Sequence, residues 1–251
     1  MSPRLLLQTA FRRARAEIAL LAALFVITGG IGLFLEIADD SREADGQAFD
    51  HAILQALHST PGDPAGPWWV EEGAVELTSL GGVAVLGLFA LFAVGFLLLQ
   101  RKRLSAALLT LGLAGGVGWS EGLKALFGRA RPPADYQAVE TINASFPSGH
   151  ALLSTVFYLS IGVMLARAFP QRRMKAYAIG AAVVLALLVG LSRIYLAAHW
   201  ATDVLAGWSV GAAWAMALWL VAWVVQRRQT ARKLPLHDEA EAVRAPAVIG
   251  E

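Results

Sequence analysis

The sequence contains no cysteine, and charged residues make up only 16% of its 251 positions. Without cysteine the chain can form neither disulfide bonds nor thiolate metal sites. The low charge accompanies 57% hydrophobic residues and a mean hydropathy of +0.55, a balance that soluble proteins of this length rarely have. A net charge of +2 gives no reason to expect a nucleic-acid partner. The composition therefore indicates an integral membrane protein.

Six apolar runs are long enough for membrane-spanning helices, since a span needs roughly 20 apolar residues. We expect them at residues 18–35, 77–99, 104–127, 151–169, 176–198 and 204–225. The first follows several arginines but lacks an obvious small-residue cleavage site, so we interpret it as a retained anchor rather than a secretory signal. The fifth is the weakest, because its uninterrupted apolar part stops near Leu191. The predicted fold is all-α, a polytopic bundle of six transmembrane helices.

Basic residues beside these runs predict the orientation of the chain. Lysine and arginine are concentrated before the first run, between the second and third, between the fourth and fifth, and after the sixth. By the positive-inside rule both termini face the cytoplasm. The extracytoplasmic face keeps only five basic residues, which are Arg42, Lys124, Arg129, Arg131 and Arg193. We therefore expect a multi-pass protein of the cytoplasmic (inner) membrane.

The connection at residues 36–76 is acidic, which suits an extracytoplasmic loop. An apolar pattern with helical spacing begins at Phe49, and Trp68 with Trp69 follows a proline-rich break. We expect an interfacial helix and an aromatic anchor here. A surface helix packed on the bundle and a lid over a substrate entrance are alternatives that the sequence does not separate.

Two further features concern the organisation of the chain. Residues 1–230 are expected to form one membrane domain, and the polar residues 231–251 a disordered cytoplasmic tail. Two of the runs carry glycines four residues apart, which favour close helix packing: Gly112 with Gly116 and Gly207 with Gly211.

Polar residues, otherwise rare in the runs, collect at those ends that the predicted topology places on the extracytoplasmic face. They are Lys124, Arg129 and Arg131 after the third run, His150 before the fourth, Arg193 and His199 at the end of the fifth, and Asp203 before the sixth. Cations and titratable histidines on one surface predict a pocket for a multiply charged anion, and phosphate is the natural candidate. Lys124, Arg131 and Arg193 can together stabilise a phosphoryl group and its transition state.

Two short segments supply the remaining chemistry of such a pocket. Ser148 and Gly149 precede the fourth run, where a serine cap, a permissive glycine and free backbone N–H groups form an anion cradle. His199 and Asp203 are four residues apart, within hydrogen-bonding reach on a helix or across a turn. A carboxylate on one imidazole nitrogen leaves the other free to attack phosphorus. His150 would then protonate the leaving oxygen.

These residues form three ordered motifs: Lys124 with Arg131 and Pro132; Pro147, Ser148, Gly149 and His150; and Ser192, Arg193, His199 and Asp203. In spacing and order they resemble the signature of the phosphatidic acid phosphatase type 2 superfamily, without a departure. The resemblance implies an all-helical core, His199 as the phosphorylated nucleophile, Asp203 as its partner and His150 as acid and then base. It also implies that the phosphate is held by Lys124, Arg131, Ser148, Gly149 and Arg193.

The resemblance further implies a substrate class. The superfamily includes soluble vanadate-binding haloperoxidases, but six spans favour a membrane lipid phosphatase that works without a metal ion or other cofactor. Bacterial members hydrolyse undecaprenyl pyrophosphate, phosphatidylglycerol phosphate or phosphatidate, and some transfer phosphate to another acceptor. We expect undecaprenyl pyrophosphate first and the other two next. The motifs distinguish neither the lipid nor the acceptor, and they do not bear on the oligomeric state.

The competing hypothesis is a six-helix transporter whose basic mouth gathers an anion. It would need polar groups in the middle of its spans, which are nearly all apolar or small here. Four nearby residues receive no catalytic role. Glu121 is expected to pair with Lys124 or with a neighbouring helix. Arg129 is expected to contact a headgroup, the pocket or the scaffold, so that Arg129→Ala would be mild. His51 and His58 are interpreted as solvated surface histidines.

Overall fold

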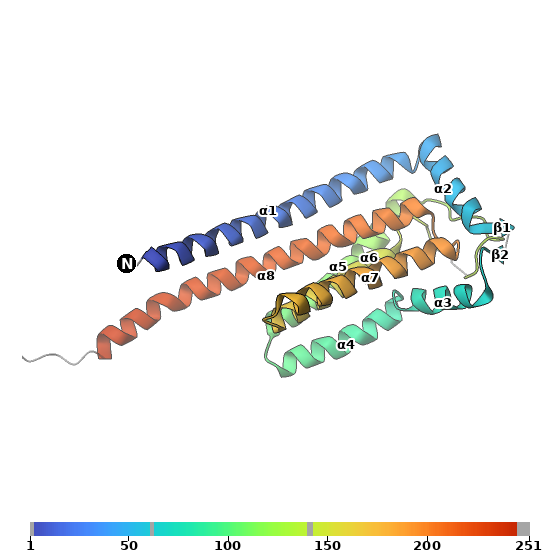
Figure 1. Cartoon of the computed structure of the whole chain (residues 1–251). Helices are drawn as coiled ribbons and strands as arrows, with labels where there is room; N and C mark the ends of the chain where they lie inside the picture. Colours follow the sequence, from blue (N-terminus) through green and yellow to red (C-terminus); the bar gives the residue numbers. More distant parts are fainter. Residues whose placement is uncertain (1–2, 61–62, 140–142, 245–251) are drawn as a thin grey trace, which may run out of the picture.

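Eight helices and one short pair of strands make up the described part of the chain, which covers residues 3–60, 63–139 and 143–244 of a computed structural model (Figure 1). The helices are α1 (Pro3–Asp40), α2 (Ala44–Leu57), α3 (Trp68–Ser79), α4 (Val83–Leu99), α5 (Arg103–Phe127), α6 (Gly149–Ala168), α7 (Arg172–Tyr195) and α8 (Ala201–Arg244). The strands β1 (His58–Thr60) and β2 (Asp63–Pro64) pair antiparallel. The fold is therefore helical, as predicted, apart from this small ladder.

Four helices are long and apolar enough to cross a membrane: α1 over Ala16–Asp40, α6, α7, and α8 over Ala201–Gln229. Helices α3 and α4, bent by 49° at their junction, would together make a fifth. Helix α5 has 25 residues but carries Arg103, Glu121 and Lys124, and it is not among the helices that meet the same criterion. Large apolar side chains are exposed along α1, α4 and α7, as expected of surfaces that face lipid.

The second predicted run, residues 77–99, is not one continuous helix. It is interrupted at residues 80–82, between α3 and α4. A Cβ atom at Gly81 would lie 2.3 Å from Val189 Cγ1 and 3.3 Å from His150 Cδ2. The glycine lets the chain bend while its backbone packs directly on these side chains. The predicted run thus corresponds to the end of α3 and all of α4, which together pass as one span with a bend.

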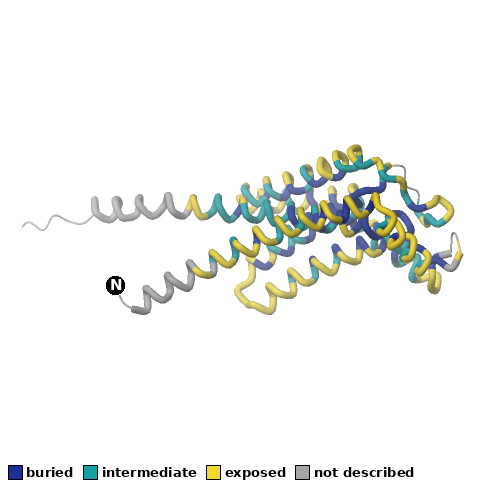
Figure 2. The backbone as a smooth tube through the Cα atoms, turned by 90° about the horizontal axis from the view of Figure 1, so that it is seen from above, coloured by how far each residue is buried: buried dark blue, intermediate teal, exposed yellow. Residues whose placement is uncertain are grey.

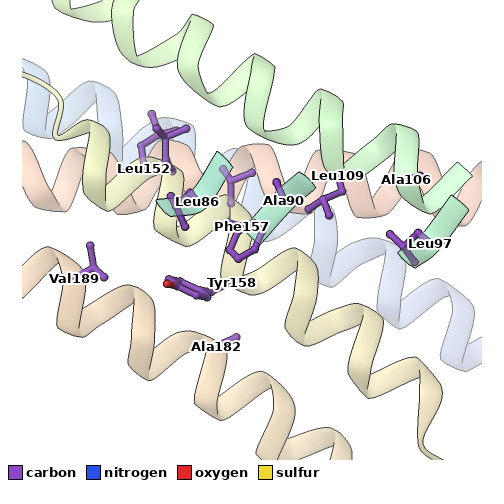
Figure 3. Packing of buried hydrophobic residues seen from close by; sticks show 12 residues of the cluster. Leu86, Ala90, Leu97, Ala106, Leu109, Leu152, Phe157, Tyr158, Ala182 and Val189 are labelled. Carbon is purple, nitrogen blue, oxygen red and sulfur yellow. The ribbon is translucent and has the colours of Figure 1, made fainter. Parts of the chain in front are cut away.

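Helix α6 is the centre of the bundle and packs against α5, α7 and α8. Its first half is almost entirely buried, as the dark segment in Figure 2 illustrates. Leu152 and Phe157 of α6 belong to an apolar core with residues of α4, α5 and α7 (Figure 3). A Cβ at Gly207 would lie 2.6 Å from the Ser148 carbonyl oxygen, and one at Gly211 2.8 Å from the Leu152 oxygen. The predicted close packing through these glycines is confirmed.

The two ends of the bundle differ in structure. We call the end with α2, the β1–β2 ladder and the start of α8 the site end, and the opposite end, with the α4–α5 and α6–α7 turns, the distal end (Figure 1). Helix α2 corresponds to the helix that was predicted within the connection at residues 36–76. Helices α1 and α8 lie side by side and project beyond the others at the distal end. Helix α8 continues to Arg244, into the segment predicted to be disordered, while residues 245–251 lie outside the described part.

Candidate active site

His199 lies in a tight turn between α7 and α8 rather than on a helix. The turn covers residues 196–200, and Ala197 adopts the left-handed conformation with φ of 49°. The backbone N–H groups of Ala198 and His199 donate to the Arg193 carbonyl at 3.1 and 3.2 Å. Leu196, Ala197 and Ala198 are fully buried, so the turn packs into the bundle. Of the two arrangements open to the sequence, helix or turn, the structure has the turn.

Asp203 sits below this turn in the first helical turn of α8 and is inaccessible to solvent. Its Oδ2 atom is 3.5 Å from His199 Nδ1 and accepts hydrogen bonds from the Trp200 backbone N–H, at 2.9 Å, and from the Ser145 hydroxyl. Its Oδ1 atom accepts from Arg129 Nη1 at 2.6 Å. The carboxylate thus faces the Nδ1 side of the imidazole, which directs the Nε2 side elsewhere.

The environment of His199 favours its neutral form. Burial lowers the pKa of this histidine from 6.5 to about 4, and the charges of Arg193 and Arg131 act in the same direction, whereas Asp203 opposes them. The imidazole is therefore uncharged at neutral pH. If Nδ1 carries the proton and donates it toward Asp203, Nε2 carries no proton and its lone pair faces Arg131 Nη1. Such a nitrogen can act as a nucleophile.

Three predicted cations converge on the two histidines. Arg131 Nη1 lies 3.2 Å from His199 Nε2 and also donates to the Ala198 carbonyl at 2.6 Å. Arg193 is buried, its Nη1 donates to Thr78 Oγ1 at 3.1 Å, and its Nε–H has no partner in the described part. A buried guanidinium donor without a partner is suited to a ligand oxygen. Arg193, Lys124 and Arg131 all lie close enough for their positive charges to act on His150.

The start of α6 lies where the sequence predicts an anion cradle, and it has the predicted serine cap. Ser148 caps this helix, accepting from the Ala151 N–H at 3.4 Å, while its own N–H donates to the Asp203 carbonyl at 2.9 Å. A Cβ at Gly149 would lie 2.9 Å from Ser120 Oγ and 3.6 Å from Lys124 Nζ. Glycine therefore keeps the space between the helix start and the lysine clear. The helix dipole adds a partial positive charge at this position.

Several contacts lie outside the predicted set. Asp50 of α2 is buried and binds both Arg129 and Thr202, and Ser145 binds Asp203. Asp50 shares an α2 face with the buried Leu54, four residues on, and a carboxylate on an apolar helix face is a signal that could have been read from the sequence. Ser145 carries no such signal. For Arg129 the sequence predicts a contact with a headgroup, the pocket or the scaffold, but it does not predict Asp50 and Asp203 as the partners.

Predictions for the remaining polar residues have mixed outcomes. The Glu121–Lys124 pair is confirmed at 3.0 Å. His58 is buried, not solvated: its Nδ1 lies 3.0 Å from the Leu54 carbonyl and its ring packs edge-on against Tyr136. It is the first residue of β1 and pairs with Pro64 across the ladder, which the sequence pattern did not reveal. His51 is exposed, although its ring contacts Trp200 at a centroid distance of 4.9 Å.

Two cavities accompany the site but do not contain His150 or His199. A polar one of about 440 Å³ lies at the site end and is lined by Arg42, His51, Asp50, Arg129 and Arg131 among others. An apolar one of about 400 Å³ lies toward the distal end between α1, α5, α6, α7 and α8. Within residues 3–60, 63–139 and 143–244, no three His, Asp or Glu side chains are grouped as metal ligands.

A helical bundle with apolar outer surfaces, with two histidines, a buried carboxylate and three cations at one end, defines a membrane protein built to bind a phosphate-like anion. The chain belongs to the PAP2 superfamily, whose family model matches residues 103–228. This range contains all of the predicted site residues. The protein is accordingly a PAP2-type membrane phosphatase, a hydrolase of phosphate esters.

Similar proteins support this assignment. Phosphatidylglycerophosphatase B of Bacillus subtilis is 33% identical over 148 residues, which cover 57% of this chain and 70% of that protein. A crystal structure described as the first transmembrane PAP2-type phosphatidylglycerolphosphate phosphatase from Bacillus subtilis matches with a TM-score of 0.72 at 27% identity, covering 81% of this chain and 97% of that one. LpxE of Aquifex aeolicus shares the fold, with a TM-score of 0.52 at 19% identity over 67% of this chain and 93% of that one.

Proposed function

We propose that the protein hydrolyses a lipid phosphate through a phosphohistidine on His199, at the extracytoplasmic face of the cytoplasmic membrane. One observation carries the proposal: His199 is a buried imidazole whose Nδ1 faces the Asp203 carboxylate, while its Nε2 lies beside Arg131. A neutral, oriented imidazole next to fixed cations is the arrangement that in-line attack on phosphorus requires.

The mechanism has two steps. In the first, the Nε2 lone pair forms a bond to phosphorus, the bond to the lipid oxygen breaks, and His150 donates a proton to that oxygen. In the second, His150 takes a proton from water, the water oxygen attacks phosphorus, and the P–N bond breaks to return neutral His199 and inorganic phosphate. Asp203 stabilises the positive imidazole ring between the steps. Lys124, Arg131 and Arg193, with Ser148 and Gly149, hold the phosphoryl oxygens.

The substrate that we favour is phosphatidylglycerol phosphate. The curated relative and the first of the solved structures, both from Bacillus subtilis, bear names that specify this activity, and a membrane setting supplies such a lipid directly. Undecaprenyl pyrophosphate and phosphatidate have the same phosphate chemistry at the head of an apolar tail and are the next candidates. This ranking revises the expectation from the motifs alone, which placed undecaprenyl pyrophosphate first.

The proposal includes a topology of six crossings, with α3 and α4 as one bent span and α5 as another. Helix α5 is 25 residues long, enough for roughly 37 Å, and packs against α4, α6 and α8 inside the bundle. The basic residues at positions 101–103 and 172–175 lie at the distal end, and by the positive-inside rule this supports a cytoplasmic location for that end and for both termini. Helix α2 would then lie at the extracytoplasmic interface. Residues 1–230 form the single membrane domain.

Phosphate release by the detergent-purified protein tests the substrate and the nucleophile together. Phosphatidylglycerol phosphate, undecaprenyl pyrophosphate and phosphatidate are supplied separately, with a chelator present in a parallel series. We expect turnover that the chelator does not reduce, and loss of at least ~10⁴-fold in His199→Ala because a covalent nucleophile has no substitute. Brief reaction with ³²P-labelled substrate should label wild type, in an acid-labile form, and leave His199→Ala unlabelled. Wild-type turnover in His199→Ala would remove His199 as the nucleophile.

A further inference from the structure

Arg129 connects two buried carboxylates that come from distant parts of the chain. It follows α5, and its Nη1 atom lies 2.6 Å from Asp203 Oδ1 while its Nη2 atom lies 2.7 Å from Asp50 Oδ2. The side chains of Asp50 and Asp203 are 1% and 0% exposed, and that of Arg129 is 15% exposed. The planar guanidinium thus spans α2 and α8 with one nitrogen on each carboxylate.

Thr202 closes the arrangement into a ring. Its hydroxyl accepts from Arg129 Nη1 at 2.8 Å and donates to Asp50 Oδ2 at 2.6 Å. Its backbone N–H donates to Asp50 Oδ1 at 2.9 Å. Since this N–H belongs to the first turn of α8, Asp50 also satisfies a backbone donor that the helix itself leaves unpaired. Both oxygens of Asp50 are therefore engaged at the start of the helix that carries Asp203.

The two carboxylate oxygens of Asp203 have different partners, and this difference shows how the hydrogen-bonded ring of Arg129, Asp50 and Thr202 affects Asp203. Its Oδ1 atom is held by Arg129, which leaves Oδ2 for Trp200 N–H, the Ser145 hydroxyl and His199. Holding one oxygen fixes the rotation of the carboxylate and hence the direction of the other. Without the guanidinium, two buried carboxylates would lose the cation that they share, a costly arrangement that Asp203 could relieve by turning away.

We propose that Arg129 and Asp50 are positioning residues, which hold the Asp203 carboxylate so that it aligns His199 with phosphorus and thereby make helix α2 part of the active site. The inference rests on the proposed function in one respect, the role of His199 as nucleophile. It replaces the expectation that Arg129→Ala would be mild, because that expectation was made without the contact to Asp203.

The test measures kcat and KM of the full-length protein in detergent with dioctanoyl phosphatidate and with phosphatidylglycerol phosphate. Arg129→Ala and Asp50→Ala are expected to lower kcat by ~100-fold with KM changed less than about threefold, since misalignment acts on the attack rather than on lipid binding. Arg42→Ala is the matched control. Arg42 lines the same cavity but stacks on the Phe127 ring, and its kcat should stay within about twofold of wild type.

Rescue separates positioning from folding. The 440 Å³ cavity opens onto Arg129 and Asp50, so a guanidinium ion can reach the place that Arg129→Ala vacates. We expect about 50 mM guanidinium chloride to restore kcat of Arg129→Ala at least ~5-fold, and not that of Arg42→Ala or His199→Ala. Arg129→Lys should keep an intermediate kcat, because one ammonium cannot bind both carboxylates in the same plane. Where Arg129→Ala fails to purify in one monodisperse species, Asp50→Asn probes the same contact, with an expected ~10-fold loss of kcat.

Two results would overturn the inference. One is a kcat of Arg129→Ala within about threefold of wild type. The other is a loss of kcat that guanidinium leaves unrestored and that comes with a lowered melting temperature, which would mark Arg129 as a purely structural residue. Failure of the proposed function looks different: His199→Ala would then keep wild-type turnover, whatever Arg129→Ala does.

Discussion

The two ends of the bundle are built from the same helices but differ in the interactions that hold their interiors together. At the site end, buried polar side chains are joined into a hydrogen-bond network. Within it, the Asp203 carboxylate accepts hydrogen bonds from three residues, which are Arg129, Ser145 and Trp200. Toward the distal end, α1, α5, α6, α7 and α8 leave an apolar cavity of about 400 Å³. Hydrogen bonds constrain distance and angle together, whereas apolar contacts constrain only distance. The positions of side chains are therefore fixed more closely at the site end, where the reaction is proposed to take place.

The contrast extends to backbone packing. At the site end, some glycines bring the backbone into direct contact with its neighbours. Gly81 packs on the side chains of Val189 and His150, and Gly207 packs on the backbone of Ser148. Elsewhere in the described helices several glycines, among them Gly87 and Gly95 of α4, have nothing within 4 Å of the position of an added Cβ. A methyl group at the first kind of position forces atoms to move, and at the second kind it does not. This difference predicts which substitutions will affect activity.

The largest expected effect follows from removing the charge at the centre of the site-end network. Asp203→Asn should lower kcat by about 10³-fold, because an amide cannot accept from all of these donors and stabilises the positive imidazole poorly. Asp39→Asn, an exposed carboxylate at the end of α1, is the control and should leave kcat unchanged. The measurement is steady-state phosphate release. Equal activities of the two variants would remove the distinction between the buried network and the surface.

A second prediction tests the backbone contact beside His150. Gly81→Ala places a methyl group against Val189 and His150, so kcat/KM should fall ~10-fold or more as the α3–α4 junction is displaced. Gly87→Ala, in open space on α4, should stay within about twofold. Both are compared in the same phosphate-release assay. If Gly87→Ala were the more damaging of the two, helix flexibility rather than close packing would govern the site.

The pH dependence of kcat/KM tests whether His199 at the site end is buried as the structure shows. Neutral His199 is the active form, and its pKa is lowered to about 4, so activity is retained above this pH and is lost as the pH falls through it. A solvated histidine with the ordinary pKa of about 6.5 would instead cost about 30-fold in activity at pH 5. We expect an acid limb near pH 4 once the ionisation of the substrate, measured by ³¹P NMR, is divided out. A limb near pH 6.5 would contradict the buried environment.

The smallest effect is expected at the distal end. Ala215→Leu adds apolar volume to a cavity that already has space, so kcat/KM should remain within about twofold of wild type. The melting temperature in detergent, measured in parallel, should hold or rise as the cavity is filled. A large loss of activity in Ala215→Leu would mean that the distal cavity takes part in function. The two ends would then not differ in their importance for activity.

Much of the site could be predicted from the sequence because membrane topology restricts where polar residues can lie. Charged groups avoid the apolar interior, so Lys124, His150 and His199 had to gather near helix ends, and counting the spans placed these ends together. The structure brings them within electrostatic reach of one another. The N-cap at Ser148 and the Glu121–Lys124 pair were equally local, and both are confirmed.

The features that escaped prediction depend on contacts between distant segments. The break at Gly81 arises from packing on α7, which no hydropathy window detects. Asp50 and Arg129 are 79 positions apart and meet only because α2 folds onto the start of α8. His58 lies in the β1–β2 ladder itself and is buried, with its ring packed against Tyr136 from a distant segment. In each case a contact with a segment distant in the sequence decides the local structure.

The glycine contacts between α6 and α8 also restrict how a lipid can reach the histidines. Where Gly207 and Gly211 meet the carbonyl oxygens of Ser148 and Leu152, there is no room even for a methyl group. An acyl or isoprenoid chain is wider than that, so this seam is closed to lateral entry from the bilayer. A lipid that reaches the histidines from the side would therefore have to pass between other helices, because α6 and α8 are in backbone contact here.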